Sequence, residues 1–270
     1  MNLKKILIRS LSGLLYIAII VGAILWGRPC ITLLSVVFGT IATIEFTKIT
    51  KGLSAARIPA LIADAAGVIC LALGSYFLPM LVWIFCMVCR LVIELYANEE
   101  DALRSLAYSM MIQVYIGMPM FVLTAFSEFL AAPHLLLAIF IFIWLNDTGA
   151  FLVGCTIGRH KLFERISPKK SWEGFFGGLA FCLGFSVLFY YVWGGWFGMR
   201  GSIWIWLGLA ALTSVFATWG DLVESLIKRN LHIKDSGNII PGHGGILDRI
   251  DSLLLVLPAT FLYLFFVEAV

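Results

Sequence analysis

Long uninterrupted apolar runs constrain this chain more than any other feature of its sequence. A helix needs about 20 consecutive apolar residues to cross a hydrocarbon core of roughly 30 Å. Such runs lie near residues 10–27, 30–47, 58–77, 79–97, 105–127, 133–153, 175–197, 202–219 and 252–269. They lack the alternation of apolar and polar residues that a transmembrane strand barrel requires. The sequence therefore predicts an all-α, polytopic transmembrane helical protein with about nine spans.

Composition excludes several other classes of protein. Apolar residues make up 61% of the chain and charged residues 13%, against roughly 45–50% and about 25% in soluble proteins. Such a chain cannot cover its surface with polar groups, which excludes a soluble enzyme, a disordered chain and a disulfide scaffold. Cys86 and Cys89, the one close pair among six cysteines, lie inside an apolar run without basic or histidine neighbours. We interpret them as packing residues rather than as a redox or zinc pair.

The positions of lysine and arginine predict the orientation. With nine spans and a cytoplasmic N-terminus, all but Arg28 and Arg200 of the 19 basic residues fall on the cytoplasmic side, as the positive-inside rule requires. The first apolar run imitates a signal peptide, but no convincing small-residue cleavage site precedes residues 26–29, so we interpret it as a retained span.

Polar residues are concentrated in the second half of the chain. Two long polar stretches, residues 158–174 and 221–251, both fall on the predicted cytoplasmic side. We therefore divide the chain into N-terminal transmembrane helices, residues 1–132, and a C-terminal catalytic transmembrane region, residues 133–270, with a polar site that faces the cytoplasm.

One polar stripe is predicted at the end of the eighth span. On a helix, Asp221, Glu224, Ser225 and Lys228 share one face over about two turns. A carboxylate at membrane depth is costly and rarely faces lipid, so the stripe should point into a polar cavity. The alternative interpretation is an intrahelical salt bridge between Glu224 and Lys228.

The loop that follows contains many glycines and acids. Four glycines and a proline between residues 237 and 245 exclude a regular helix and suit backbone that passes close to a ligand. Asp248 and Asp251 can project together from the first turn of the last span. Two or three carboxylates are the usual protein ligands of Mg²⁺, whereas zinc is disfavoured because only His243 stands nearby.

A third polar element precedes these two. Asp147 lies within an apolar span, which makes it a functional candidate. Lys169, Lys170 and Ser171 stand at a helix entrance, where ammonium groups, backbone N–H groups and the helix dipole can hold a phosphate. The alternative is that these lysines only set the topology.

Together these elements offer carboxylates to bind a cation, lysine and arginine side chains to bind phosphates, and glycines that let the backbone pass close to a ligand. This combination predicts phosphoryl or nucleotidyl transfer at a membrane surface. A Walker pattern is absent from the sequence. Gly154 and Gly158 are interpreted as allowing close helix packing. The residues alone name neither the nucleotide nor the lipid.

Residues 225–251 closely resemble the signature of the phosphatidate cytidylyltransferases, also called CDP-diacylglycerol synthases, and read SLIKRNLHIKDSGNIIPGHGGILDRID. Residues 167–174, SPKKSWEG, and 147–151, DTGAF, also look like that family. The strong similarity covers residues 144–251, while the first five spans match only in hydropathy.

The resemblance implies a reaction, cofactors and partners. CTP and phosphatidate would give CDP-diacylglycerol and pyrophosphate, with Mg²⁺ required and room for K⁺ beside it. The resemblance also implies a homodimer among membrane lipids in the bacterial inner membrane, with the active site facing the cytoplasm and no nucleic acid as a partner.

The resemblance also assigns roles by motif position. The implied metal ligands are Asp221, Asp248 and Asp251, with Asp147 completing the metal or polar shell. The implied catalytic residues are Asp221, Lys228, Arg229, Asp248, Arg249 and Asp251. The implied substrate contacts are Lys169, Lys170, Ser171, Lys234, Asp235, His243, Gly244 and Gly245. His243 is either a phosphate donor or a residue that orders the loop.

Two rival functions remain at this stage. A CTP-dependent kinase of a polyprenol-type lipid alcohol would release CDP instead of pyrophosphate. A transporter is suggested by Glu45, Asp64 and Asp147 within apolar spans. Against a transporter, the polar residues crowd one membrane face instead of tracing a route across it.

Overall fold

The structure is a computed structural model, and it describes residues 3–50, 57–74, 77–97, 101–129, 133–199, 202–240 and 244–267. It divides into two compact units. Unit 1 comprises Met1–Glu128 and Ile233–Ile250, and unit 2 comprises Phe129–His232 and Asp251–Val270. The boundary therefore runs through the last helix, and each unit combines segments that are far apart in the sequence.

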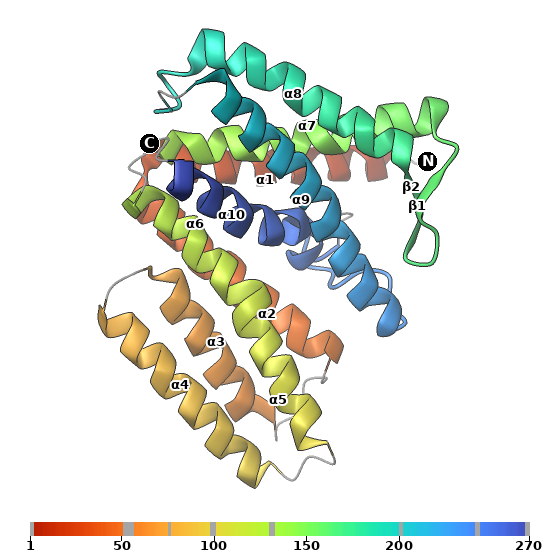
Figure 1. The fold of residues 1–270 in the computed structure, drawn as a ribbon. Helices are drawn as coiled ribbons and strands as arrows, with labels where there is room; N and C mark the ends of the chain where they lie inside the picture. Colours follow the sequence, from red (N-terminus) through yellow and green to blue (C-terminus); the bar gives the residue numbers. More distant parts are fainter. Residues whose placement is uncertain are drawn as a thin grey trace. The chain divides into compact units, whose positions relative to one another are not determined.

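Unit 1 is a set of apolar helices (Figure 1). They are α1 (Leu3–Trp26), α2 (Arg28–Thr50), α3 (Ile58–Ala72), α4 (Phe77–Tyr96), α5 (Ala102–Met111), the π-helical turn η2 (Ile112–Gly117) and α6 (Met118–Phe129). Asp101 is the N-cap of α5, and its carboxylate accepts the backbone N–H of Arg104 at 2.9 Å. The last segment of unit 1 is the glycine-rich loop and the first turn of α10 (Leu247–Val267).

Unit 2 has three long helices, a short hairpin and most of α10. The elements are α7 (Pro133–Ile157), β1 (Lys161–Phe163), β2 (Ser167–Ser171), α8 (Trp172–Trp193) and α9 (Ile203–Asn230). The Ser171 hydroxyl accepts the backbone N–H of Gly174 at 3.2 Å, and the Ser202 hydroxyl accepts that of Trp204 at 3.1 Å. These two serines are N-caps, which explains why α8 and α9 begin where they do.

The apolar runs of the sequence are helices, as predicted. Within the described residues, seven helices are long and apolar enough to cross a membrane, and Ser10–Trp26 and Ile58–Ala72 are shorter apolar helices. The long ones are Arg28–Thr50, Phe77–Tyr96, Ala102–Glu128, His134–Ile157, Trp172–Trp193, Ile203–Asn230 and Leu247–Val267. Each predicted span overlaps one of these nine segments. The count of nine spans and the cytoplasmic N-terminus stay predictions.

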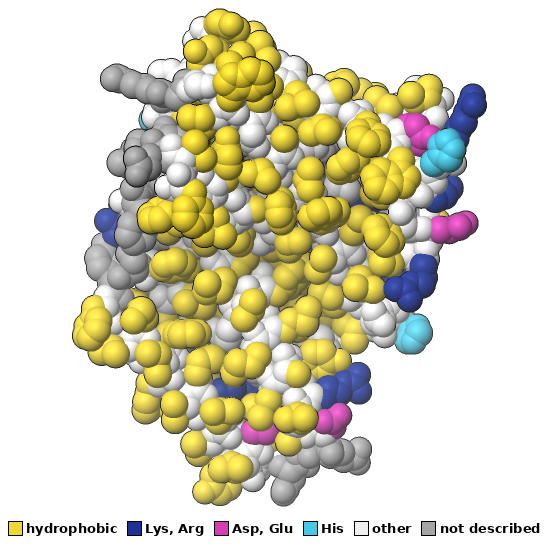
Figure 2. Space-filling view, viewed as in Figure 1, with side chains coloured by type: hydrophobic (Ala, Val, Ile, Leu, Met, Phe, Trp, Pro, Cys, Tyr) yellow, Lys and Arg dark blue, Asp and Glu magenta, His cyan; other side chains and the backbone are white. Residues whose placement is uncertain are grey.

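Large apolar side chains are exposed over much of the surface. Figure 2 shows hydrophobic side chains covering most of the visible face, with few charged ones among them. On α4, Phe77, Leu78 and Phe85 are each about two-thirds exposed or more. A soluble protein would not expose apolar patches of this extent. The chain is an integral membrane protein.

The hairpin is a feature that the sequence did not predict. β1 and β2 pair antiparallel, with Lys161 opposite Ser171 and Phe163 opposite Ser167, and the ladder is irregular between the two pairs. A predicted span is recognised by its apolar run, whereas this hairpin is short, polar and rich in lysine. The pairing of β1 with β2 satisfies backbone groups between α7 and α8, and β2 ends at Ser171, the N-cap of α8.

Small residues allow α7 and α8 to pack closely. A Cβ atom on Gly174 would lie 2.8 Å from the Ala150 carbonyl oxygen and 3.3 Å from the Gly154 Cα. A Cβ atom on Gly177 would lie 2.5 Å from the Val153 Cβ. A Cβ atom on Gly158 would lie 2.6 Å from Ser171 Oγ, so Gly154 and Gly158 both lie where the two helices approach, as their interpretation as packing residues requires.

Unit 1 buries a charged network among α3, α4 and α5. Arg90 is fully buried, and its guanidinium donates to Glu94 Oε2 at 2.5 Å, to Ser109 Oγ at 2.8 Å and to Ser105 Oγ at 2.9 Å. Ser109 in turn donates to Asp64 Oδ2 at 2.8 Å. Asp64, one of the carboxylates that suggested a transporter, is therefore part of a helix-to-helix network.

Candidate functional site

A polar cavity of about 300 Å³ opens in unit 2, within the usual size range of small-molecule sites. It is built where α7, β2, α8 and α9 come together. Its lining combines charged and polar side chains with aromatic ones: Asn146, Asp147, Phe151, Leu162, Lys169, Lys170, Ser171, Phe175, Thr218 and Asp221, with Ala150 and Gly174 between them. Five residues selected from the sequence, Asp147, Lys169, Lys170, Ser171 and Asp221, thus share one cavity.

Lys170 is the best-anchored cation of this cavity. Its ammonium nitrogen lies 2.7 Å from Asp221 Oδ2 and donates to the Thr218 carbonyl oxygen at 3.2 Å. The lysine is 24% exposed and the aspartate 38%, so the pair faces the cavity and is not sealed in the core. A phosphate that enters the cavity would meet a fixed ammonium group whose present partner is a carboxylate.

Asn146 joins the cavity wall to the helices behind it. The residue is buried, its Oδ1 accepts the Ser214 hydroxyl at 2.7 Å, and its Nδ2 donates to Thr218 Oγ1 at 3.4 Å. A Cβ atom on Gly178 would lie 2.5 Å from Asn146 Oδ1, so α7, α8 and α9 all pack around this amide. Sequence reasoning selected Asp147 but not its neighbour. The available signal was an amide next to a carboxylate inside an apolar run.

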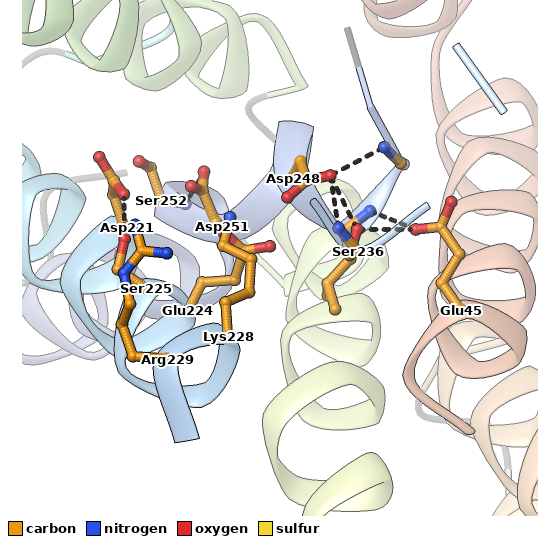
Figure 3. Close-up of polar contacts among 12 residues, drawn as sticks. Glu45, Asp221, Glu224, Ser225, Lys228, Arg229, Ser236, Asp248, Asp251 and Ser252 are labelled. Carbon is orange, nitrogen blue, oxygen red and sulfur yellow. Dashed lines mark hydrogen bonds and ion pairs between the residues drawn. The ribbon is translucent and has the colours of Figure 1, made fainter. Parts of the chain in front are cut away.

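The polar stripe of α9 lies on one helix, as predicted (Figure 3). Ser225 donates to Asp221 Oδ1 at 3.2 Å, and Lys228 forms an ion pair with Glu224, which is fully buried. The intrahelical salt bridge considered as the alternative is therefore present. Arg229 donates to the Ile166 carbonyl oxygen at 3.3 Å, which ties the end of α9 to the β1–β2 hairpin.

Gly220 brings α9 and α10 into contact beside this stripe. A Cβ atom on Gly220 would lie 2.6 Å from the Asp251 carbonyl oxygen and 2.8 Å from the Ser252 Cα. Figure 3 shows Asp221 beside Asp251 and Ser252. Asp251 lies within electrostatic range of Asp221 and of Asp147, so its carboxylate is repelled by both.

These carboxylates suit Mg²⁺, which needs few protein ligands, better than a metal whose ligands all come from the protein. Over the part of the chain that the structure describes, no group of three or more His, Cys, Asp or Glu side chains is arranged to hold a metal ion. Mg²⁺ needs only one or two carboxylates, because water and substrate phosphates complete its shell. Asp221 and Asp251 supply that donor set, with Lys170 paired to Asp221 and Lys228 within electrostatic range of Asp251.

The other predicted site residues belong to unit 1. Asp248 Oδ2 accepts the Gly245 N–H at 2.8 Å, the Ser236 N–H at 2.9 Å and the Ser236 hydroxyl at 3.0 Å. Gly244 has a φ of +83°, and a Cβ atom there would lie 2.6 Å from the same oxygen. The glycine-rich backbone was predicted to pass close to a ligand. In the structure Gly244 passes close to the Asp248 carboxylate of this chain.

The structure describes most, but not all, of the remaining residues that the sequence selected. Lys234, Asp235 and Arg249 are exposed, and the Arg249 carbonyl oxygen accepts the Tyr16 hydroxyl at 3.0 Å. His243 lies outside the described residues. Glu45, whose role the sequence left open, is buried against the same loop and is considered separately below.

Comparisons with known proteins agree with the resemblance seen in the motifs. A protein named phosphatidate cytidylyltransferase from Staphylococcus aureus (strain COL) is 46% identical over 155 residues, which is 56% of each chain. The proteins of the same name from Staphylococcus haemolyticus (strain JCSC1435) and Staphylococcus epidermidis (strain ATCC 12228 / FDA PCI 1200) are 42% and 44% identical over 157 and 153 residues, again 56% of each chain. The chain thus matches little more than half the length of these relatives.

The family comparison extends over nearly all of the sequence. The sequence model described as the Cytidylyltransferase family matches residues 7–267, which includes the helices of both units. The predicted motifs, the cavity and this match lead to the same assignment. The chain belongs to the cytidylyltransferase family.

Proposed function

We propose that this protein transfers the cytidylyl group of CTP to phosphatidate, which gives CDP-diacylglycerol and pyrophosphate for phospholipid biosynthesis. The observation that carries the proposal is the 46% identity over 155 residues to a protein named phosphatidate cytidylyltransferase. A cavity lined by two lysines and two aspartates in an otherwise apolar protein supports it, because both substrates carry phosphate groups.

The reaction requires positioning and charge neutralisation more than covalent help from the protein. An oxygen of the phosphatidate phosphate forms a bond to the α-phosphorus of CTP, and the bond from that phosphorus to pyrophosphate breaks. Lys169 and Lys170 would neutralise phosphate oxygens and hold the two substrates in line. Lys228, Arg229, Lys234 and Arg249 are proposed as further phosphate contacts on the strength of the motif resemblance.

Mg²⁺ is the proposed cofactor. Asp221 and Asp251 would hold it, with Asp147 completing the polar shell, and the bound ion would supply positive charge for the departing pyrophosphate. The motif resemblance adds Asp248 as a further ligand. K⁺ beside Mg²⁺ and a homodimer are also proposals from the resemblance.

The proposed location is the bacterial cytoplasmic membrane, with the cavity facing the cytoplasm. The distribution of basic residues supports this orientation, because the positive-inside rule then holds for all but Arg28 and Arg200. CTP would reach the site from the cytoplasm and phosphatidate from the bilayer.

The proposed reaction is tested by supplying purified protein with phosphatidate, Mg²⁺ and CTP labelled at the α-phosphorus. We expect a labelled liponucleotide and one pyrophosphate released per transfer. Asp221→Asn should lower turnover at least about 100-fold, or roughly 2.7 kcal/mol, because it removes one ligand charge and the partner of Lys170.

Asp101→Asn provides the matched control. Asparagine caps a helix as well as aspartate does, and Asp101 begins α5 in unit 1, so this variant should retain full turnover. Release of CDP without pyrophosphate would select the lipid-alcohol kinase instead. CTP left unconsumed by a folded protein would exclude both enzymes and return the transporter to consideration.

A further inference from the structure

Glu45 is a buried carboxylate from α2 that contacts a loop about 200 positions later in the chain. It is only 3% exposed. Its Oε1 accepts the Ile246 N–H at 3.0 Å, and its Oε2 accepts the Leu247 N–H at 2.9 Å and the Ser236 hydroxyl at 3.3 Å (Figure 3). All of these residues belong to unit 1.

The physical setting explains why a carboxylate can be buried there. The first N–H groups of a helix lack partners within the helix, and the helix dipole places partial positive charge at that end. An isolated buried carboxylate would cost many kcal/mol, so it persists only where hydrogen bonds replace water. Glu45 occupies the N-terminus of α10, where an external anion would otherwise bind.

The glycines of the loop are fitted to this carboxylate. A Cβ atom on Gly237 would lie 2.5 Å from Glu45 Oε1 and 2.9 Å from its Cδ. A Cβ atom on Gly245 would lie 2.6 Å from the same Oε1. Any larger residue at either position would force the glutamate or the loop to shift.

Ser236 links Glu45 to Asp248. Its hydroxyl lies 3.3 Å from Glu45 Oε2 and 3.0 Å from Asp248 Oδ2. The hydroxyl has one hydrogen, so it can donate to only one of the two carboxylates at a time. Asp248 Oδ2 also accepts the backbone N–H groups of Ser236 and Gly245, and the next two amides along the chain, those of Ile246 and Leu247, are held by Glu45. The loop that holds Asp248 is therefore itself held by Glu45.

We propose that Glu45 is a positioning residue for the transfer reaction. By holding the Ile246 and Leu247 amides and sharing the Ser236 hydroxyl, it fixes the Asp248 carboxylate in the geometry needed to bind Mg²⁺. This inference rests on the proposed function, in which Asp248 is a metal ligand. The anchoring of the α10 N-terminus by Glu45 can be measured without any turnover.

Glu45→Gln tests the proposal with almost no change in side-chain size. An amide has one acceptor oxygen where the carboxylate has two, so one of the two α10 amides must lose its partner. We expect hydrogen exchange at the Ile246 and Leu247 amides to accelerate at least about tenfold. We also expect the Mg²⁺ concentration for half-maximal activity to rise at least about fivefold.

Glu94→Gln is the matched control. Glu94 is also a buried glutamate on a helix of unit 1, but its partners are Arg90 and Ser105 and not residues of the loop. This variant should leave amide exchange at residues 246–247 and the Mg²⁺ dependence unchanged. It thus separates a general loss of stability from the specific role of Glu45.

Gly237→Ala serves as a second variant in case Glu45→Gln does not fold. It keeps the glutamate but pushes a methyl group against it, and it should reproduce both effects. Gly22→Ala on α1, where a Cβ atom meets nothing within 4 Å, should produce neither.

The proposal requires both faster amide exchange at residues 246–247 and a higher Mg²⁺ concentration for half-maximal activity. Unchanged amide exchange, or unchanged Mg²⁺ dependence, in folded Glu45→Gln and Gly237→Ala proteins would overturn the positioning role. Failure of the wild-type protein to use CTP would overturn the proposed function and with it the catalytic meaning of Glu45. The exchange measurement would still show whether Glu45 anchors α10.

Discussion

At the scale of single residues, Lys170 shows how the cavity constrains a side chain. Its ammonium group contacts both Asp221 Oδ2 and the Thr218 carbonyl oxygen, a geometry suited to a compact point charge. A planar guanidinium is larger and spreads its donors over a fixed fork. We expect Lys170→Arg to lower kcat/KM for CTP at least about tenfold, on the order of 1.4 kcal/mol, in steady-state assays.

Lys161→Arg on the same hairpin is the control for Lys170. Lys161 is exposed and does not line the cavity, so its replacement should leave kcat/KM unchanged. Lys170→Gln tests the alternative in which the lysine only sets topology. Full activity of a correctly inserted Lys170→Gln protein would contradict a phosphate-binding role for this residue.

The residues that the sequence could select are those that stand out locally. Asp147 lies within an apolar run and Asp221 at the end of one, where a charge is costly at membrane depth. Lys170 stands at a helix entrance, a position suited to holding a phosphate. Thr218 and Glu45 could not be assigned in this way. The role of Thr218 comes from its carbonyl oxygen, and the partners of Glu45 lie about 200 positions away.

At the scale of elements, the approach of α7 to α8 shapes the cavity. Gly177 faces Val153 so closely that an added Cβ atom would lie 2.5 Å from the valine Cβ. We expect Gly177→Val to destabilise the protein by about 1–3 kcal/mol through overpacking, measured as a lower midpoint of thermal unfolding in detergent. Turnover should fall too, because the parts of α7 and α8 that carry Asp147 and Gly174 would separate.

Gly184→Val on the same helix is the comparison for Gly177→Val. A Cβ atom on Gly184 meets nothing within 4 Å, so valine there should leave the unfolding midpoint unchanged or raise it slightly, since valine is a better helix residue than glycine. Equal midpoints for the two variants would mean that α7 and α8 are not held by this contact.

Helices were predictable from apolar runs, but irregular elements were not. The run near residues 105–127 gives a continuous helical segment, yet it contains the π-helical turn η2. In η2, the Gln113 side chain donates to the Asp64 carbonyl oxygen at 3.0 Å and accepts from Trp83 Nε1 at 3.2 Å. The turn coincides with these tertiary contacts, which composition does not reveal.

At the scale of the whole molecule, the orientation in the membrane can be tested directly. The predicted topology places Lys161 in the cytoplasm and Arg28 outside. In a background with the six native cysteines replaced by alanine, we expect a membrane-impermeant thiol reagent added to intact cells to label Arg28→Cys and not Lys161→Cys. The opposite labelling pattern would reverse the topology and place the cavity on the outer face.

The division into compact units was beyond what the sequence alone could predict. Residues 233–250 join the N-terminal helices, whereas residues 251–270 join the helices that begin at Phe129. Hydropathy describes each apolar run by itself and carries no information about pairing between distant segments. The contacts of Glu45 with Ser236, Ile246 and Leu247 are among those that join the first of these segments to the helices of unit 1.

The buried network around Arg90 has a consequence for how the chain enters the bilayer during synthesis. An arginine in the middle of an isolated inserting helix raises the apparent free energy of insertion by roughly 2.5–3.5 kcal/mol. Among the described residues, the partners of the guanidinium are Glu94 on its own helix and Asp64, Ser105 and Ser109 on α3 and α5. Insertion of α4 as a separate step would leave Ser105 and Ser109 unavailable, because α5 is made later. We therefore expect joint insertion of α3, α4 and α5 to be favoured over insertion of α4 alone, because the full set of Arg90 partners forms only when α5 has been made.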